Sequence, residues 1–224
     1  CDIMTVKGKF IVLEGVDGSG ISTQTSLLQQ WMYENEQSFR KTYFTKEPTD
    51  GPVGNIIRLA LAKRLKPLDE RVMALLFAAD RLDHLFCSGN DQQKDGLLKL
   101  LDNGTNVVSD RYLLSSFAYQ SIGVDLDWVR EINKFSPMPD LTILLLVSAE
   151  KSAQRREKSR IHEELYEHKS CIANIRMQYE KIAQMLRSEG QNILIIDAER
   201  ERENIFIEIR QAVKNLFADN RQDK

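Results

Sequence analysis

Residues 10–23 of this 224-residue chain read FIVLEGVDGSGIST, an apolar run followed by a glycine-rich turn and a helix-forming stretch. Residues 10–13 are apolar throughout, which is typical of a strand covered on both faces. Four residues separate Gly15 from Gly20, and Ser22 follows, so the spacing is that of a phosphate-binding loop. Glycines let backbone N–H groups surround an anion, and the next helix adds the positive end of its dipole. We therefore predict a strand, a phosphate loop and a helix in this order.

The loop lacks the lysine that usually follows its last glycine. Position 21 is isoleucine, which cannot donate to a β- or γ-phosphate. Ser22 keeps the hydroxyl that holds nucleotide-bound magnesium in such loops. A glycine-rich turn between a strand and a helix can be only a turn, but the retained serine and the strand–loop–helix context favour a phosphate site.

Four further apolar runs alternate with helix-forming segments. The strand candidates are residues 41–45, 106–109, 141–147 and 192–196. The clearest helical patterns cover residues 24–33, 69–86 and 170–189. Continuous apolar runs indicate strands of a parallel sheet, and their alternation with helices predicts the α/β class. We expect a single domain over residues 1–224, built on a doubly wound, parallel five-stranded sheet with helices on both faces.

The charge balance and the hydrophobic content exclude some functions. The chain has 31 Lys and Arg against 33 Asp and Glu residues, a net charge of −2, and 42% hydrophobic residues. That hydrophobic content is typical of a globular protein rather than a disordered one. Broad nucleic-acid binding normally requires a basic excess, so we expect no nucleic-acid partner.

The cysteines and the hydropathy pattern indicate the compartment. Cys1, Cys87 and Cys171 are too scattered for a zinc site or a disulfide framework, which predicts a reducing, intracellular setting. No run approaches the ~18 apolar residues of a membrane span, and none has the form of a signal peptide. We therefore expect a cytoplasmic protein without membrane association.

Four chemically distinctive segments follow the glycine-rich loop. They are residues 45–54 (TKEPTDGPVG), 76–84 (LFAADRLDH), 110–120 (DRYLLSSFAYQ) and 139–142 (PDLT). Together with residues 10–20, they resemble the motifs of thymidylate kinases, a family of P-loop nucleoside monophosphate kinases. Five motifs in the family's order, spanning about residues 9 to 180, are far more specific than any one of them.

The resemblance implies an activity and an assembly. The activity is transfer of the γ-phosphate of ATP to dTMP, giving ADP and dTDP for dTTP synthesis, with Mg²⁺ as cofactor. The implied fold is a P-loop kinase with a helical lid at about residues 155–169. Family members are commonly homodimers, so we expect a dimer with the helix over residues 69–86 in or near the contact.

The resemblance also implies where the donor nucleotide binds. The ATP-binding residues would be Gly15, Val16, Asp17, Gly18, Ser19, Gly20, Ile21, Ser22 and Thr23, with Arg155 stacked on adenine. Ser22 and Asp110, a Walker-B-type carboxylate at the end of the third strand, would hold Mg²⁺. Taken alone, Asp110 and Arg111 could instead form a surface ion pair.

The implied acceptor site would bind dTMP. Its residues would be Asp17, Lys46, Phe77, Arg81, Arg111, Ser115, Ser116 and Tyr119. Asp17 would accept from the sugar 3′-hydroxyl, and Phe77 would stack on thymine, worth about 1–3 kcal/mol. Ser115 and Ser116 would read the thymine edge, and the ring of Tyr119 would disfavour ribonucleotides. Without the resemblance, a phenylalanine at helical spacing would more often belong to the core.

Three cations belong to the same acceptor site. Arg111 would grip the acceptor phosphate with its planar fork. Arg81 lies four residues after Phe77 on the same helix face and could reach the base or the phosphate. Lys46 stands where the family usually has arginine, so it keeps the charge but loses the fork.

The charged segment at residues 155–169 has two interpretations. Its mixture of basic and acidic residues alone indicates a solvated helix face. The resemblance makes it the lid that closes over ATP and delivers cations to the transferring phosphoryl group. The implied catalytic residues are Asp17, Arg111, Arg156, Lys158 and Arg160.

Ile21 leaves three explanations open. The lid cations could compensate for the missing lysine, so that the enzyme is active. The chain could instead be a degenerate paralogue that binds nucleotides with little kinase activity, or the isoleucine need not be the natural residue. A related kinase acting on another nucleoside monophosphate is the remaining alternative. An isoleucine here could also point into the phosphate site and obstruct it.

Overall fold

A parallel sheet forms the centre of the molecule. The computed structural model describes residues 7–39, 41–87, 95–157 and 169–218, and in these ranges it contains a five-stranded, all-parallel sheet. The strands are β1 (Phe10–Gly15), β2 (Thr42–Lys46), β3 (Asn106–Asp110), β4 (Leu141–Leu146) and β5 (Ile193–Asp197), in the order β2-β3-β1-β4-β5. The predicted α/β fold with a doubly wound parallel sheet is confirmed.

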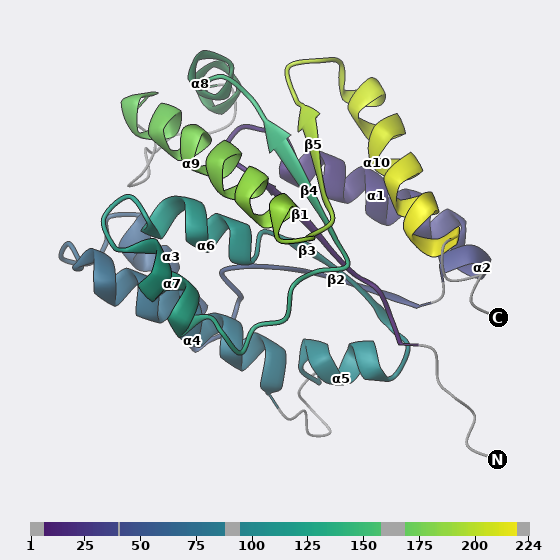
Figure 1. Cartoon of the computed structure of the whole chain (residues 1–224), viewed down its shortest axis with the longest axis horizontal. Helices are drawn as coiled ribbons and strands as arrows, with labels where there is room; N and C mark the ends of the chain where they lie inside the picture. The colour runs from purple at the N-terminus through teal and green to yellow at the C-terminus, as the bar shows by residue number, and fades with distance from the viewer. Residues whose placement is uncertain (1–6, 40, 88–94, 158–168, 219–224) are drawn as a thin grey trace.

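Helices cover both faces of this sheet (Figure 1). They are α1 (Ile21–Glu34), α2 (Glu36–Phe39), α3 (Pro52–Leu61), α4 (Glu70–Phe86), α5 (Leu97–Asp102), α6 (Leu113–Gln120), α7 (Leu126–Ile132), α8 (Ala149–Glu157), α9 (Lys169–Ser188) and α10 (Arg202–Ala218). α1 packs against α10 on one face, and α6 packs against α9 on the other. Within the described ranges, none of the helices has the length and apolar character needed to cross a lipid bilayer.

Burial explains the apolar character of the central strands. All six residues of β1 are buried, as are five of the six in β4. Because helices cover both faces, side chains that point either way reach the core. The edge strand β2 is only half buried, which accounts for its weaker sequence pattern.

Helices α3 and α4 form a smaller packing unit beside the sheet. Ile57 and Ala60 of α3 pack with Met73 of α4 in a core cluster of their own. α4 begins after Asp69, whose carboxylate accepts a hydrogen bond from the Arg71 N–H at 2.9 Å and caps the helix. This unit fixes the wall of α4 that faces the site.

The carboxyl ends of β1, β2 and β3 meet at one edge of the sheet. Leu13 of β1 and Lys46 of β2 both lie opposite Asp110 of β3 in the strand register. The glycine-rich loop follows β1 directly. Ligands of open α/β sheets bind at this edge, so the fold brings distant parts of the sequence to one place.

Candidate active site

The loop between β1 and α1 is a tight turn rich in glycine. Gly18 and Gly20 have φ angles of 77° and 99°, in the left-handed region that glycine adopts without strain. The Ser19 N–H donates to the Val16 carbonyl at 3.0 Å and closes a turn, and α1 begins directly afterwards at Ile21. N–H groups at the start of a helix bind anions. The loop therefore has the form of a phosphate site.

Ile21 packs inward from the start of α1. It belongs to the main core cluster and is only 4% exposed, although it borders the cavity of the site. The isoleucine therefore fills space in the core, and whether it also obstructs a bound phosphate stays a prediction. Residues 15–23 contain no Lys or Arg, so positive charge for the phosphates has to come from other elements.

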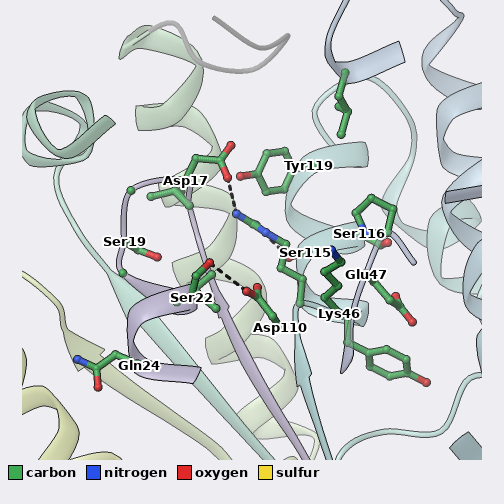
Figure 2. Close-up of a pocket in the computed structure, with 18 of the residues that line it drawn as sticks. Asp17, Ser19, Ser22, Gln24, Lys46, Glu47, Asp110, Ser115, Ser116 and Tyr119 are labelled. Atoms are coloured by element: carbon green, nitrogen blue, oxygen red, sulfur yellow. Dashed lines mark hydrogen bonds and ion pairs between the residues drawn. The ribbon is translucent and has the colours of Figure 1, made fainter. Parts of the chain in front are cut away.

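Ser22 and Asp110 meet beside the loop (Figure 2). The Ser22 hydroxyl donates to Asp110 Oδ2 at 3.2 Å, and burial raises the pKa of the Asp110 carboxyl. Both groups supply the oxygen ligands that Mg²⁺ prefers, and a cation would offset the cost of ionising a buried carboxyl. In the described residues, no group of three His, Cys, Asp or Glu side chains is arranged to hold a metal. Mg²⁺ here would take its remaining ligands from phosphate and water, as nucleotide-bound magnesium usually does.

Arg111 ties the loop to the end of β3. Its guanidinium donates to Asp17 Oδ1 at 2.6 Å and to the Gly15 carbonyl at 2.7 Å, and it lies 5.6 Å from the ring centroid of Tyr119. Burial disfavours its charge, but Tyr119 and Asp17 outweigh burial and hold the pKa of Arg111 well above its usual value. The φ angle of Arg111 is 70°, a costly conformation for a non-glycine residue that often marks a functional site. Four predicted site residues, Gly15, Asp17, Arg111 and Tyr119, thus lie together.

Glu14, directly before the loop, has a role that the sequence did not reveal. The residue is fully buried, and its carboxylate accepts from the N–H groups of Tyr112 at 2.9 Å and Ser115 at 3.2 Å. The Ser115 hydroxyl and the Tyr179 hydroxyl of α9 donate to the same carboxylate. Burial raises the pKa of Glu14, and the hydrogen bonds from Ser115 oppose that rise. Glu14 therefore joins β1 to the start of α6 and fixes the position of Arg111.

Arg81 lies in a buried network in the cavity wall. Its guanidinium donates to Glu47 Oε2 at 2.9 Å, to the Ser116 hydroxyl at 2.9 Å and to the side-chain carbonyl of Asn133. The second carboxylate oxygen of Glu47 lies 3.2 Å from His84 Nδ1, and Arg81 is 1% exposed. These partners hold the guanidinium plane in one orientation. That suits recognition of a fixed ligand atom better than capture of a moving phosphate.

The end of the cavity formed by α4 and α6 can accept a flat base. Phe77 borders the cavity, and its ring also packs on the cluster between α3 and α4. The hydroxyls of Ser115 and Ser116 are both engaged by buried side chains. Gln120 is 3% exposed and borders the cavity, and its side-chain carbonyl has no hydrogen-bond partner among the described residues. Because an unpaired buried amide is costly, Gln120 is a candidate base-reading residue that the sequence analysis missed.

Two cations border the cavity from β2 and α3. Lys46 Nζ lies 3.2 Å from Asp50 Oδ1, and its side chain is 56% exposed, so it can turn toward a ligand at little cost. Arg58 of α3 donates to the Pro48 carbonyl at 3.0 Å and to the Thr49 carbonyl. The sequence analysis named Lys46 but not Arg58, because nothing in the sequence shows that α3 returns to the site.

One cavity of about 780 Å³ joins these groups. Among the described residues, its walls carry six cationic side chains and three carboxylates. The cations are Lys46, Arg58, Arg81, Arg111, Arg155 and Arg202, and the carboxylates are Asp17, Glu47 and Asp110. This volume is typical of a small-molecule site, and the positive excess suits a strongly anionic ligand.

Comparison with known proteins identifies the family. The sequence model for thymidylate kinase matches residues 13–209. The chain belongs to the thymidylate kinase family. A relative from Pyrococcus abyssi, named "probable thymidylate kinase", is 36% identical over 215 residues, which are 94% of this chain and 98% of the relative. A relative of the same name from Methanocaldococcus jannaschii is 35% identical over 213 residues, again 94% and 98% of the two chains.

Most of the predicted thymidylate kinase site lies around the one cavity. Its lining includes Val16, Asp17, Gly18, Ser19, Gly20, Ile21, Ser22, Thr23, Lys46, Phe77, Arg81, Asp110, Arg111, Ser115, Ser116, Tyr119 and Arg155. Gly15 contributes its carbonyl to Arg111. The structure brings these residues together, while the role of each in binding a nucleotide stays a prediction.

The predicted lid of this thymidylate kinase family member is described only at its two ends, residues 155–157 and residue 169. Arg155 belongs to α8, and its guanidinium donates to backbone carbonyls of the phosphate loop. The backbone of Arg156 continues α8, whereas Lys158 and Arg160 lie outside the described residues. The catalytic role of these lid cations therefore stays a prediction, as does stacking of Arg155 on adenine.

Proposed function

We propose that this protein transfers the γ-phosphate of ATP to dTMP, giving ADP and dTDP. The observation that carries the proposal is the single cavity shared by the phosphate loop, the Ser22–Asp110 pair and the α4–α6 end with Phe77 and Gln120. A reaction between two nucleotides needs both phosphate groups in one enclosed, positively charged space. Membership of the thymidylate kinase family and the names of the two relatives support the same activity.

The acceptor would lie between α4, α6 and the end of β3. Phe77 offers a face for the thymine ring, and Arg81 and Gln120 offer polar groups to its edge. Asp17 would accept from the 3′-hydroxyl, and its 2.6 Å bond to Arg111 supports the proposal that this arginine would grip the phosphate beside the sugar. Because these groups are already held by the fold, little ordering is needed when dTMP binds.

The donor phosphates would lie on the loop. N–H groups of the loop and the start of α1 would bind them, and Ser22 with Asp110 would hold Mg²⁺ through the hydroxyl and carboxylate oxygens. A metal held by Ser22 and Asp110 would supply positive charge that offsets the negative charge of the donor phosphates. Lys46, Arg58 and Arg111 border the same space, so the transferring group would be flanked by cations from three elements.

Transfer then needs positioning rather than a covalent intermediate. The two phosphates must be in line, and water must be excluded from the γ-phosphate. Arg111 would hold the attacking phosphate while its backbone, fixed through Glu14 and α6, resists displacement. The closing lid at residues 155–169 would supply the remaining cations, Arg156, Lys158 and Arg160.

An acceptor panel tests this proposal. Steady-state assays with MgATP and dTMP, dUMP, dGMP or CMP should give the highest kcat/KM with dTMP. Arg111→Ala should lower kcat/KM for dTMP by about 10²-fold or more, because it removes a bidentate phosphate contact made in the transition state. Preference for another monophosphate would replace dTMP by that nucleotide as the substrate.

We also propose a cytoplasmic homodimer. Val72 and Leu75 of α4 are 43% and 49% exposed, and Ile56 and Leu59 of α3 are each 43% exposed. Apolar side chains gathered on one helical unit suit burial against a second copy of the chain. The cytoplasmic location rests on the sequence pattern and stays a prediction.

A further inference from the structure

Helix α8 contacts the phosphate loop along three consecutive peptide groups. The Ser152 hydroxyl donates to the Asp17 carbonyl at 2.6 Å. Arg155, three residues later on the same helix face, donates through one nitrogen to the Gly18 and Ser19 carbonyls at 3.4 Å and 3.3 Å. All three loop carbonyls are therefore turned toward α8. We call Ser152 and Arg155 the carbonyl clamp.

Because the peptide bond is planar, the orientation of these carbonyls also sets the orientation of the N–H groups that follow them. In a trans peptide, the carbonyl of one residue and the N–H of the next point in opposite directions. Holding the three carbonyls toward α8 thus turns the N–H groups of Gly18, Ser19 and Gly20 away from it. The Ser19 N–H closes the turn with Val16. By the same peptide geometry, we infer that the N–H groups of Gly18 and Gly20 lie on the side of the loop away from α8.

Helix α8 is itself held firmly against the sheet. The Ser148 N–H, just before the helix, donates to Glu199 Oε1 at 2.9 Å. Arg155 donates with its second nitrogen to the Ala198 carbonyl at 2.8 Å, and Ser152 is fully buried. The start of α8 and Arg155 are therefore both hydrogen-bonded to the segment that follows β5. Through Ser152 and Arg155, α8 supports the loop from this position.

We propose that the carbonyl clamp positions the phosphate loop and so maintains donor-phosphate binding in a loop that has no lysine. The proposal rests on the proposed function, because it takes the phosphates of ATP as the ligand of this loop. Ser152 and Arg155 are positioning residues that act on the ligand through the backbone of residues 17–20. The family resemblance gives Arg155 a different contact, with adenine, and gives Ser152 none.

Titration calorimetry with two probes separates these roles. MgATP carries a base, whereas inorganic tripolyphosphate has none on which Arg155 could stack. Ser152→Ala removes a neutral donor, and Arg155→Lys keeps the charge but loses the planar fork. We expect the Kd of both probes to rise about fivefold in Ser152→Ala and about tenfold in Arg155→Lys. In steady-state assays, the KM for ATP should rise while the KM for dTMP stays near the wild-type value.

Gln154→Ala, on the exposed side of the same helix, is the matched control and should bind both probes like the wild type. The proposal is overturned if the Kd of tripolyphosphate is unchanged in both clamp variants. It is also overturned if Arg155→Lys raises the Kd of MgATP but not that of tripolyphosphate. Thermal unfolding shows whether each variant folds. If Ser152→Ala does not fold, the binding results for Arg155→Lys decide the proposal, because Arg155 is only partly buried. A wild-type protein that binds both probes but forms no dTDP contradicts the proposed function alone.

Discussion

Ile21 is the residue at which this chain departs most from a standard phosphate loop. A lysine there would touch the donor phosphates, whereas the isoleucine is 4% exposed and packs in the main core. The loop still has glycines at left-handed φ angles and a serine paired with Asp110. The site therefore keeps its means of binding phosphate and loses one cation that acts in the transition state.

Replacing Ile21 with lysine should raise activity and lower stability. We expect Ile21→Lys to increase kcat by about tenfold or more, because one well-placed cation at a transferring phosphoryl group is worth this much or more. Loss of a buried isoleucine should lower the free energy of unfolding by about 1–3 kcal/mol. Steady-state kinetics and urea unfolding measure the two effects. Ile21→Met is the apolar control, and an equal gain in kcat for it would show that charge is not the cause.

Gln120 offers a second test at the scale of one residue. Its side-chain carbonyl is unpaired among the described residues and borders the cavity beside α4. Gln120→Ala should raise the KM for dTMP about tenfold, because a base that loses a buried hydrogen bond is bound less tightly. The KM for ATP should not change. Equal effects on both substrates would mean that Gln120 supports the fold and does not read the base.

Single residues were predictable from the sequence where a motif places them directly after a strand. Asp17 and Ser22 follow β1, and Asp110 ends β3, so their convergence follows from a parallel sheet. Glu14 and Arg58 were not predictable in the same way. Their roles depend on partners on other elements, such as Ser115 and the Thr49 carbonyl, which no local pattern reveals.

At the scale of elements, the sequence predicted which strands and helices exist better than it predicted where they begin and end. All five strands lie within one or two residues of the apolar runs, because burial on both faces requires that pattern. α1 begins at Ile21, three residues before the predicted start, since glycine at position 20 obscured where the helix begins. α8 and its contacts with the loop were not predicted, because its charged sequence alone indicates a solvated helix.

The contact between β1 and α6 predicts a pH dependence of stability. Burial raises the pKa of Glu14 above its ordinary value, so the unfolded chain loses this proton at a lower pH than the folded protein does. The Glu14 contribution to folding is therefore largest below the ordinary pKa and declines as the pH rises through the raised one. Each unit by which the pKa in the folded protein exceeds that in the unfolded chain changes the free energy of unfolding by about 1.4 kcal/mol.

Glu14→Gln should remove this decline. Urea unfolding of both proteins at a series of pH values should show the variant gaining stability relative to the wild type as the pH rises. The wild type at each pH serves as the control, so effects of other titrating groups cancel. A difference in the free energy of unfolding that is constant with pH would contradict the raised pKa of Glu14.

At the scale of the whole molecule, the formal net charge of −2 conceals a strongly positive site. The described lining of the cavity has six cations and three carboxylates, so the negative excess lies elsewhere on the protein. The balanced composition of the whole chain could not show this concentration of charge. Only the parallel sheet, which gathers loops from distant segments, creates it.

The exposed apolar side chains of α3 and α4 predict the oligomeric state. Sedimentation equilibrium should show a dimer of the wild-type chain. Leu75→Glu should weaken the dimer by 10²-fold or more in Kd, about 3 kcal/mol, because it places a charge in the buried contact. Met177→Glu is a matched control, since Met177 is 58% exposed on α9, away from this unit. A monomeric wild type would contradict the proposed assembly.

The most direct test of the central claim is the formation of dTDP by the protein with its isoleucine at position 21. Purified wild-type protein, MgATP and dTMP should give dTDP at a rate well above the background without protein, and Ile21→Lys should give it faster. A wild type that forms no dTDP above background, while Ile21→Lys does, would contradict phosphoryl transfer by this protein. In that case the fold binds nucleotides but has lost phosphoryl transfer.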